Sequence, residues 1–285
     1  MLLTSITYFG EDLQMDNRPI GIFDSGIGGL TSVTHLMKHL PDERVIFFGD
    51  TARTPYGSKS IDTIRQFTMQ IGEFLAKNNV KMMCIACNTI SSTCIEDLRN
   101  AYPDIPVIGV ISPTAKVVAR DCDPEDRIGI LATKATIRSG AYEAKIRRNN
   151  PQMRHIFTKA CPAFVPLIEE GIIDNEIMDL TIKYYLDDFM ETNDINTLVL
   201  GCTHYPLIKK NIERLYPGTR IVNSSKEVAR AVHIELEKRG MFAGPGGEDS
   251  VFYASDLSEN FVNMIELILG KDQDELNIRF KNLDI

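Results

Sequence analysis

The sequence predicts an α/β protein made of two similar parallel-sheet units, with a crevice between them. Short apolar runs alternate with amphipathic segments almost from end to end of the 285 residues. Such alternation is typical of parallel sheets covered by helices on both faces. The pattern of the first half also recurs in the second half, as expected for an internal repeat. Ligands of parallel sheets bind beyond the carboxyl ends of the strands, so we expect the chemistry just after the apolar runs.

The apolar runs define the expected strands, and the amphipathic segments between them define helices. In segment 61–75, Ile61, Ile64, Phe67 and Ile71 recur at three- and four-residue spacing, which indicates a helix. The expected strands, in chain order, are 19–23, 45–48, 80–85, 107–111, 127–131, 155–158, 197–200, 220–222 and 251–253.

Four matches support the internal repeat. Each match alone is weak, but all four occur in the same order with slowly rising offsets, as small loop insertions would produce. The matched pairs are 20–22 with 128–130, 46–47 with 156–157, 107–108 with 221–222, and Cys87 with Cys202. The alternative is one larger sheet whose strands merely look alike.

Composition excludes several classes of function. The net charge of −8 disfavours a nucleic-acid surface or a polybasic membrane anchor, and we expect the basic residues at 145–148 to be a solvated helix face. No apolar stretch approaches the roughly 20 residues of a membrane helix. The start of the chain, 1–17, does not resemble a secretory signal. Six cysteines in a chain of this length do not form a disulfide scaffold, so we expect a cytoplasmic, reduced protein.

Two segments after the first two strands are candidate binding loops. Segment 24–29 (DSGIGG) opens a helix, where glycines and the helix N-terminus favour an anion, although Asp24 alone is equally a helix cap. The spacing is not G-x-G-x-x-G, so a dinucleotide site is not expected. In segment 49–57, Asp50 and Arg53 are candidates for an ion pair. Its end, 55–57 (PYG), is a turn that offers backbone N–H groups and a phenol to a ligand, or is a turn alone.

The cysteines follow the ends of two strands. Cys84 and Cys87 have the spacing of a redox or zinc motif, but Cys84 lies inside an apolar run, and no second cysteine pair or His–His spacing follows. We therefore expect Cys84 and Cys94 to be core residues, and no metal site. Cys202 is followed two residues later by His204, a group that can tune or relay a thiol proton.

A reactive thiol needs a neighbour, because a free cysteine with a pKa of about 8.5 is mostly protonated at neutral pH. His204 can serve Cys202, and Asp24 can serve Cys87 if adjacent strand ends bring them together. Glu169 and Glu170 follow segment 161–166, and the sequence alone favours a solvated helix face for both. Two opposed thiols, one deprotonated and one protonated, would remove a proton from one face of a carbon acid and return one to the other face.

The combined motifs resemble the glutamate racemase family, cofactor-independent enzymes that supply D-glutamate for peptidoglycan. The motifs are 24–26 (DSG), 49–53 (GDTAR), 55–57 (PYG), 86–89 (ACNT) and 201–206 (GCTHYP), and the resemblance runs from about residue 18 to 269. It implies two α/β domains related by a pseudo-twofold axis, with the C-terminal segment returning to the first. The expected domains are 18–112 completed by 227–285, and 113–226, after an N-terminal extension, 1–17.

The resemblance also implies roles for residues. Cys87 would take the proton from D-glutamate with help from Asp24, and Cys202 from L-glutamate with help from His204, with Glu169 nearby. The implied substrate-binding residues are Ser25, Asp50, Pro55, Tyr56, Gly57, Asn88, Thr89, Thr133, Thr136 and Thr203. No cofactor is implied. A homodimer and regulation by a cell-wall precursor, known for some family members with an amino-terminal extension, are further expectations.

Three alternatives stay open at the level of sequence. One is a related racemase that acts on aspartate or another small acid. Another is an amino-acid-binding sensor that lost turnover, although both cysteines and both assisting groups are present. A thiol redox protein would require Cys84 and Cys87 to be exposed. Segment 223–225 (NSS) stands where many family members carry an Asp-Ser pair, which puts a role there in doubt.

Overall fold

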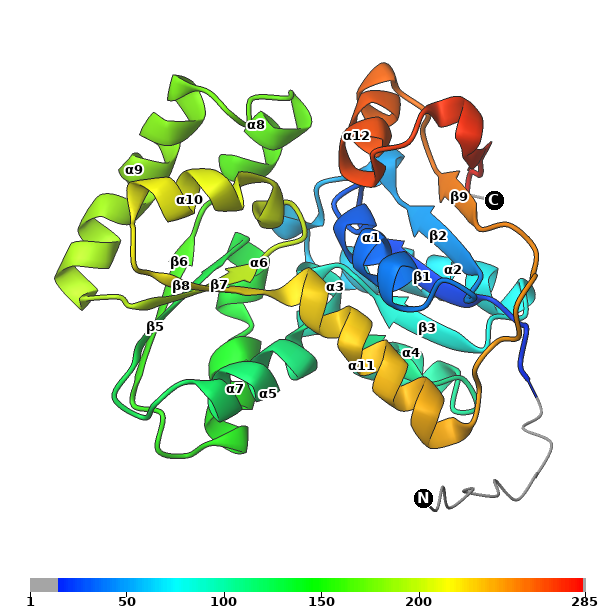
Figure 1. The fold of residues 1–285 in the computed structure, drawn as a ribbon, viewed down its shortest axis with the longest axis horizontal. Coiled ribbons are helices and arrows are strands. Elements are labelled where there is room, and N and C mark those ends of the chain that lie inside the picture. The colour runs from blue at the N-terminus through cyan, green and yellow to red at the C-terminus, as the bar shows by residue number, and fades with distance from the viewer. Residues whose placement is uncertain (1–14, 284–285) are drawn as a thin grey trace, which may run out of the picture.

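A computed structural model describes residues 15–283 as two parallel sheets that lie side by side, each covered by helices (Figure 1). The first sheet has the order β10-β9-β2-β1-β3-β4 and the second β6-β5-β7-β8. The strands are β1 (Ile20–Asp24), β2 (Val45–Gly49), β3 (Met82–Ile85), β4 (Val107–Gly109), β5 (Arg127–Ala132), β6 (His155–Ala160), β7 (Thr197–Gly201), β8 (Arg220–Asn223), β9 (Val251–Ala254) and β10 (Asn277–Phe280).

Helices connect the strands, and α11 runs from the second sheet back to the first (Figure 1). The helices are α1 (Leu30–His39), α2 (Ile61–Lys77), α3 (Asn88–Thr93), α4 (Ile95–Ala101), α5 (Ile111–Asp121), α6 (Lys134–Arg138), α7 (Ala141–Asn149), α8 (Phe164–Glu169), α9 (Glu176–Asn193), α10 (Lys209–Leu215), α11 (Ser224–Arg239) and α12 (Glu259–Leu269). None of the helices in residues 15–283 has the length and apolarity to cross a bilayer.

The sheets confirm the repeat and exclude the single larger sheet. The order β2-β1-β3-β4 in the first sheet recurs as β6-β5-β7-β8 in the second. Ile22 pairs with Cys84 and Ile130 pairs with Val199, so Cys84 and Val199 are equivalent, and three residues further on Cys87 matches Cys202.

One of the sequence matches is out of register. In the first sheet, Ile46 pairs with Gly21. Gly129 is the counterpart of Gly21 in the second sheet, and it pairs with Phe157, so Phe157 rather than Ile156 is the counterpart of Ile46. The pairing of segment 46–47 with 156–157 is therefore wrong by one residue. Two neighbouring apolar residues on each strand allow either alignment by sequence, and only the strand pairing separates them.

The expected strands are present, with small shifts in their ends. Strand β3 begins at Met82 rather than Val80, and β4 ends at Gly109 because Ile111 already begins α5. Strand β10 was not expected. Its sequence, Asn-Ile-Arg-Phe, has no apolar run, because this edge strand is mostly exposed. The buried strands β1, β2 and β7, in contrast, are apolar throughout or nearly so.

Helix α2 confirms the amphipathic segment 61–75. Ser60 caps its first turn by accepting a hydrogen bond from the backbone N–H of Thr63. Of the periodic positions, Ile64 and Ile71 are buried against the first sheet, while Ile61 is exposed at the helix start.

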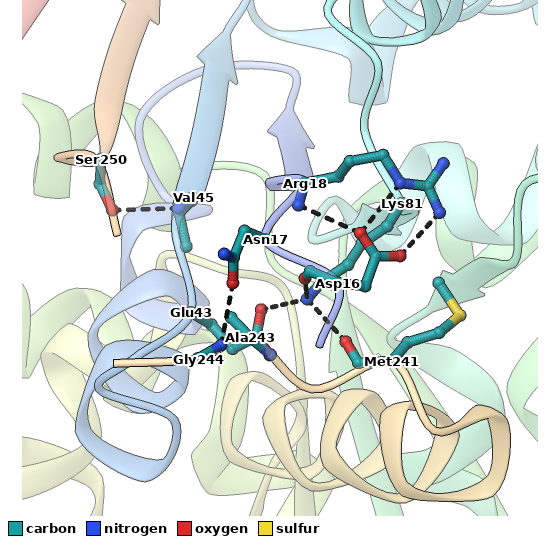
Figure 2. A network of polar contacts seen from close by, with 10 residues as sticks. All are labelled: Asp16, Asn17, Arg18, Glu43, Val45, Lys81, Met241, Ala243, Gly244 and Ser250. Carbon is teal, nitrogen blue, oxygen red and sulfur yellow. Dashed lines mark hydrogen bonds and ion pairs between the residues drawn. The ribbon is translucent and has the colours of Figure 1, made fainter. Parts of the chain in front are cut away.

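A polar network closes the end of the first sheet that lies away from the carboxyl ends of its strands (Figure 2). The Lys81 ammonium is 2.7 Å from a Glu43 carboxylate oxygen, and both side chains are buried. Lys81 also donates to the backbone carbonyls of Asp16 and Met241, and Glu43 accepts from the N–H of Ala243. The network thus fixes both the chain before β1 and the chain after α11. Residues 1–14 of the expected N-terminal extension lie outside the described residues.

Candidate active site

Cys87 and Cys202 lie at the carboxyl ends of equivalent strands, where the site was expected. Cys87 follows β3 and directly precedes α3, and Cys202 directly follows β7. Their exposed fractions are only 4% and 5%. Both thiols are therefore almost completely shielded from solvent in this conformation.

Asp24 is the acid beside Cys87, because β1 and β3 are neighbours in the first sheet. One carboxylate oxygen, Oδ2, accepts hydrogen bonds from the backbone N–H groups of Gly26 (3.2 Å) and Gly29 (3.0 Å). It therefore fixes the loop before α1, much as the helix-cap interpretation expected. The other oxygen, Oδ1, is buried without a hydrogen-bond partner among the described residues. Burial raises the pKa of Asp24, while His204 and the two N–H groups act in the opposite direction.

The environment of Cys87 favours its neutral thiol. The Sγ atom donates to Ser25 Oγ at 3.3 Å. Burial, followed by the charge of Asp24, raises the pKa of Cys87 to about 12. Desolvation and a nearby carboxylate both disfavour a thiolate, so Cys87 is in the form that can donate a proton.

Cys202 has a different neighbour. The His204 ring nitrogen Nε2 is 3.0 Å from Glu169 Oε1, and the ring also interacts with Cys202. Burial alone lowers the pKa of His204, but the hydrogen bonds with Cys202 and Glu169 outweigh it and raise the pKa to about 10. The raised pKa favours the protonated ring of His204, which places a positively charged donor beside the Cys202 side chain. Glu169, for which sequence alone favoured a solvated helix face, instead lies in this site at the end of α8.

Residues from the two halves meet around the thiols. The hydroxyl of Thr89 is 3.0 Å from that of Thr133 and 3.5 Å from that of Thr136. The Tyr142 hydroxyl donates to Asn88 Oδ1 at 2.6 Å, which leaves the buried Asn88 Nδ2 without a partner among the described residues. These hydroxyls and this free amide donor can bind carboxylate and amino groups of a small ligand.

The other expected binding residues lie at the same edge of the sheets. Thr203 is buried between Cys202 and His204. Pro55 directly precedes the short 3₁₀ turn Tyr56–Ser58, where an added Cβ on Gly57 would lie 2.9 Å from Thr133 Cβ. The first N–H groups of such a turn have no partner inside it, so they can bind an anion.

Two side chains of segment 49–57 that were expected to bind substrate have protein partners in the structure. The carboxylate of Asp50 already binds Arg53 and Tyr56 through Oδ2, and Ser255 through Oδ1. The Tyr56 phenol is buried and donates to Asp50, so the backbone N–H groups of this turn, rather than the phenol, are the donors left for a ligand. The expected Asp50–Arg53 ion pair is confirmed, at 2.7 Å. Asp50 therefore supports the turn, and direct substrate contact by its carboxylate is not favoured by this geometry.

Sequence reasoning missed two residues that hold others in place. Ser255 bonds to Asp50 and to the backbone N–H of Ala52, and Tyr142 orients Asn88. Both are distant in sequence from their partners and have no local motif. Only the fold, which returns the chain to the first sheet after α11, could reveal Ser255.

The redox and zinc interpretations of the cysteines are not supported. All six cysteines are free and buried. Cys84 and Cys94 belong to the core as expected, and Cys84 and Cys87 are not the exposed pair that a redox protein requires. Within residues 15–283, no group of three or more His, Cys, Asp or Glu side chains is arranged to hold a metal ion.

Comparison with known proteins decides the family. The model of the Asp/Glu/Hydantoin racemase family matches residues 31–232. The chain is 42% identical over 253 residues to the glutamate racemase of Persephonella marina, which covers 89% of this chain and 94% of the relative. The chain belongs to the glutamate racemase family. A glutamate racemase of Neisseria meningitidis is similarly close, at 43% identity over 262 residues, 92% of this chain and 96% of the relative.

Solved structures of this family have the same fold. Francisella tularensis glutamate racemase, in complex with D-glutamate, has a TM-score of 0.87 at 38% identity and covers 94% of this chain and 99% of its own. The Escherichia coli glutamate racemase, in complex with L-glutamate and the activator UDP-MurNAc-ala, has a TM-score of 0.75 at 26% identity, with 93% and 98% covered. The aspartate racemase of Picrophilus torridus, at 17% identity and a TM-score of 0.52, shares the fold only.

Proposed function

We propose that this protein interconverts L- and D-glutamate by proton transfer at Cα between two thiols, without a cofactor. The observation that carries the proposal is the pair of buried thiols at equivalent strand ends with unlike neighbours. Asp24 lies beside Cys87, and the Glu169–His204 pair lies beside Cys202. Membership of the glutamate racemase family supports glutamate as the substrate.

The proton transfers follow from these neighbours. For L-glutamate, a lone pair of the Cys202 thiolate forms a bond to the Cα proton, and the electron pair of the broken C–H bond stays on Cα as the carbanion. The thiol of Cys87 then gives its proton to the opposite face, and the product is D-glutamate. For D-glutamate the roles are exchanged, with Asp24 accepting the proton of Cys87 and His204 supplying one to Cys202. Burial of both thiols excludes water, which would otherwise quench the carbanion.

The proposed substrate contacts come from both halves. Oδ1 of Asp24 and Nδ2 of Asn88, both buried and without partners in the described part of the chain, support contacts to the amino group and a carboxylate. Hydroxyl groups and the N–H groups of the 55–57 turn would hold the remaining oxygens. The proposed hydroxyl donors are Ser25, Thr89, Thr133, Thr136 and Thr203.

The test is incubation with L- or D-glutamate in deuterated water without added cofactor. We expect racemisation with deuterium entering Cα of the product, and little turnover of aspartate. Turnover of aspartate in preference to glutamate would favour a related small-acid racemase. Binding of glutamate without exchange would favour a sensor, and a requirement for pyridoxal phosphate or a metal would contradict the two-thiol chemistry.

The two-thiol assignment has its own test. We expect Cys87→Ala and Cys202→Ala each to abolish racemisation, since each removes the only group able to reach one face of Cα. Cys122→Ala is the matched control. Cys122 is a buried thiol beside Arg220, away from Cys87 and Cys202, so this variant should retain activity. Near-full activity in either of the first two variants would contradict the assignment.

The biological setting is part of the same proposal. D-glutamate supplied by this reaction would enter peptidoglycan, and the enzyme would act in the cytoplasm, where its thiols stay reduced. Free, buried cysteines are consistent with that compartment.

We also propose regulation by an anionic nucleotide-linked precursor of the cell wall. A cavity of about 560 Å³ lies between β4, α5 and α11, and its lining includes Arg99, Lys116, Arg120 and Arg230. Glu227 and Glu235 also line this cavity, but the basic side chains outnumber them, and a lining with net positive charge suits a diphosphate. We expect UDP-MurNAc-Ala to change the rate, and Lys116→Ala to weaken that response. Lys271→Ala, in a different cavity, is the control. A rate that is insensitive to the nucleotide would exclude this regulation.

A homodimer completes the proposal. Ile177, Leu180 and Tyr184 lie on one face of α9 and are exposed, Tyr184 by 81%. Apolar side chains grouped in this way favour contact with a second copy. Sedimentation equilibrium should show a dimer that Leu180→Glu dissociates. A monomeric native protein would exclude this interface.

A further inference from the structure

The first turn of α1 touches the loop that carries Cys202 and His204, although the two belong to different halves. A Cβ added to Gly28 would lie 2.5 Å from His204 Nδ1 and 2.5 Å from Thr203 Oγ1. The backbone before α1 therefore lies directly against both side chains. Nothing larger than glycine fits between them unless the loop moves.

Thr31, three residues further on, holds the same loop through its hydroxyl group. Its Oγ1 is 3.0 Å from the backbone carbonyl of Thr203, 2.8 Å from that of Gly28 and 2.7 Å from Ser225 Oγ. Thr31 is buried and Ser225 is completely buried. One hydroxyl group thus joins α1, the Cys202 loop and the first turn of α11.

The carbonyls of Thr203 and Gly28 only accept, so Thr31 donates wherever it bonds to them and can share its one proton between the two. With that proton directed to the carbonyls, Thr31 accepts the proton of Ser225. Ser225 is itself held, since its backbone N–H donates to Asn223 Oδ1 at 2.9 Å. Thr31 is therefore oriented by α11 and in turn orients the Thr203 carbonyl.

The Thr203 peptide stands between Cys202 and His204, so its orientation determines how the imidazole meets the thiol. We propose that Thr31 is a positioning residue for the Cys202–His204 pair and couples contact between the two halves to assembly of that pair. The inference rests on the proposed racemase function. When the halves separate, the bond to Thr203 breaks, and the Cys202 side of the site loses its alignment. The Cys87 side keeps its own contacts, which lie within the first half.

The experiment uses Thr31→Val, which keeps the shape and removes the hydroxyl, and Thr31→Ser, which keeps the hydroxyl. Thr34→Val is the matched control, because it makes the same change one turn along α1, where, within residues 15–283, the Thr34 hydroxyl donates to the backbone carbonyls of Leu30 and Ile268 and to no group of the Cys202 loop. Because the two enantiomers have equal free energy, kcat/KM must change equally in both directions. We expect Thr31→Val to lower it by about tenfold, as loss of one positioning hydrogen bond would. Thr31→Ser should restore most of it, and Thr34→Val should match the native protein.

The decisive measurement is the primary deuterium isotope effect on kcat/KM with each enantiomer labelled at Cα. If Thr31→Val slows only the transfer at Cys202, the isotope effect rises with labelled L-glutamate and falls with labelled D-glutamate. An unchanged rate, or equal shifts with both enantiomers, would overturn the inference. Absence of racemisation in the native protein would instead overturn the proposed function. Should Thr31→Val not fold, as judged by circular dichroism, Ser225→Ala should give the same asymmetric shift, and its absence overturns the inference.

Discussion

Cys87 and Cys202 are equivalent in the fold but not in their chemistry. Cys87 lies beside a buried carboxyl group that favours its thiol form, whereas Cys202 lies beside a histidine whose raised pKa favours the protonated ring. The resting protein is thus prepared to accept a proton at one end and to donate one at the other. The duplicated sheets supply the symmetry of position, and single side chains supply the difference.

At His204 the raised pKa predicts how stability depends on pH. Folding favours the protonated ring, because the folded pKa of about 10 exceeds the ordinary value of about 6.5. The stabilisation is therefore full below pH of about 6.5 and is lost as the pH rises towards about 10. We expect the free energy of unfolding of the native protein to fall over this range more steeply than that of His204→Asn.

Urea denaturation at a series of pH values measures this difference. Glu169→Gln should reduce the extra slope, since the carboxylate partner at 3.0 Å is removed. Titrating groups that do not contact His204 contribute equally to both proteins and cancel, so the difference reports on His204 together with its partners Cys202 and Glu169. Parallel curves for the native protein and His204→Asn would show that the ring is not protonated in the folded state.

Residue identities were the most predictable part of the site. Both cysteines, Asp24 and His204 could be proposed because each follows an apolar run that ends at the same edge of a sheet. The hydrogen bond that Asp50 accepts from Ser255 could not be predicted from the sequence. It depends on Ser255, which is 205 positions away and is brought close only by β9.

Among the elements, the first turn of α1 controls the site through its closeness to the Cys202 loop. We expect Gly28→Ala to lower activity by at least about tenfold while the fold is kept, because the new methyl group must displace the His204 ring. The comparison is Gly247→Ala, where an added Cβ meets no atom within 4 Å. Kinetics and a thermal melt of both variants check this. Native activity in Gly28→Ala would show that the loop adjusts freely.

At the opposite end of the first sheet, the Lys81–Glu43 pair determines stability rather than chemistry (Figure 2). We expect Lys81→Met to cost about 3–5 kcal/mol of unfolding free energy, because it leaves a buried carboxylate without its cation. The double variant Lys81→Met, Glu43→Gln should recover part of this loss, since the amide still accepts from Ala243 and carries no charge.

Chemical denaturation of the two variants measures both values. Activity of folded Lys81→Met at low temperature should be near native, since the network lies at the far end of the strands from the thiols. A double variant no more stable than the single one would mean that the lost contacts to the backbone carbonyls of Asp16 and Met241 dominate.

Across the whole molecule, the thiols are closed between two halves, and the chain crosses between the halves more than once. The strands of the first sheet come from 20–109 and 251–280, and those of the second from 127–223. This division supports the proposed domains 18–112 with 227–285, and 113–226. Helix α11, which leaves the second sheet and packs against α1, then belongs to the first domain except for its first residues, 224–226.

Closure of the site predicts slow chemical modification of the thiols. Thiols that are about 95% buried meet a reagent only when the structure around them opens. We expect iodoacetamide to label Cys87 and Cys202 more slowly than free cysteine, and saturating D-glutamate to slow the labelling further. Mass spectrometry of peptides resolves each site. Labelling at the rate of free cysteine, with no protection by substrate, would show that the site is open in solution.

The sequence by itself determined the α/β class, the positions of nine strands along the chain, the repeat and the two thiols. These features are local or periodic, because a buried parallel strand must be apolar and a ligand-binding loop must follow it. Only the tertiary structure decided how β2 aligns with its counterpart β6 in the repeat, and only it showed the edge strand β10. It also decided the hydrogen bond between Asp50 and Tyr56 and the contact of Thr31 with the Cys202 loop. Each of these depends on which distant segments meet, and the pattern of one segment carries no information about its partner.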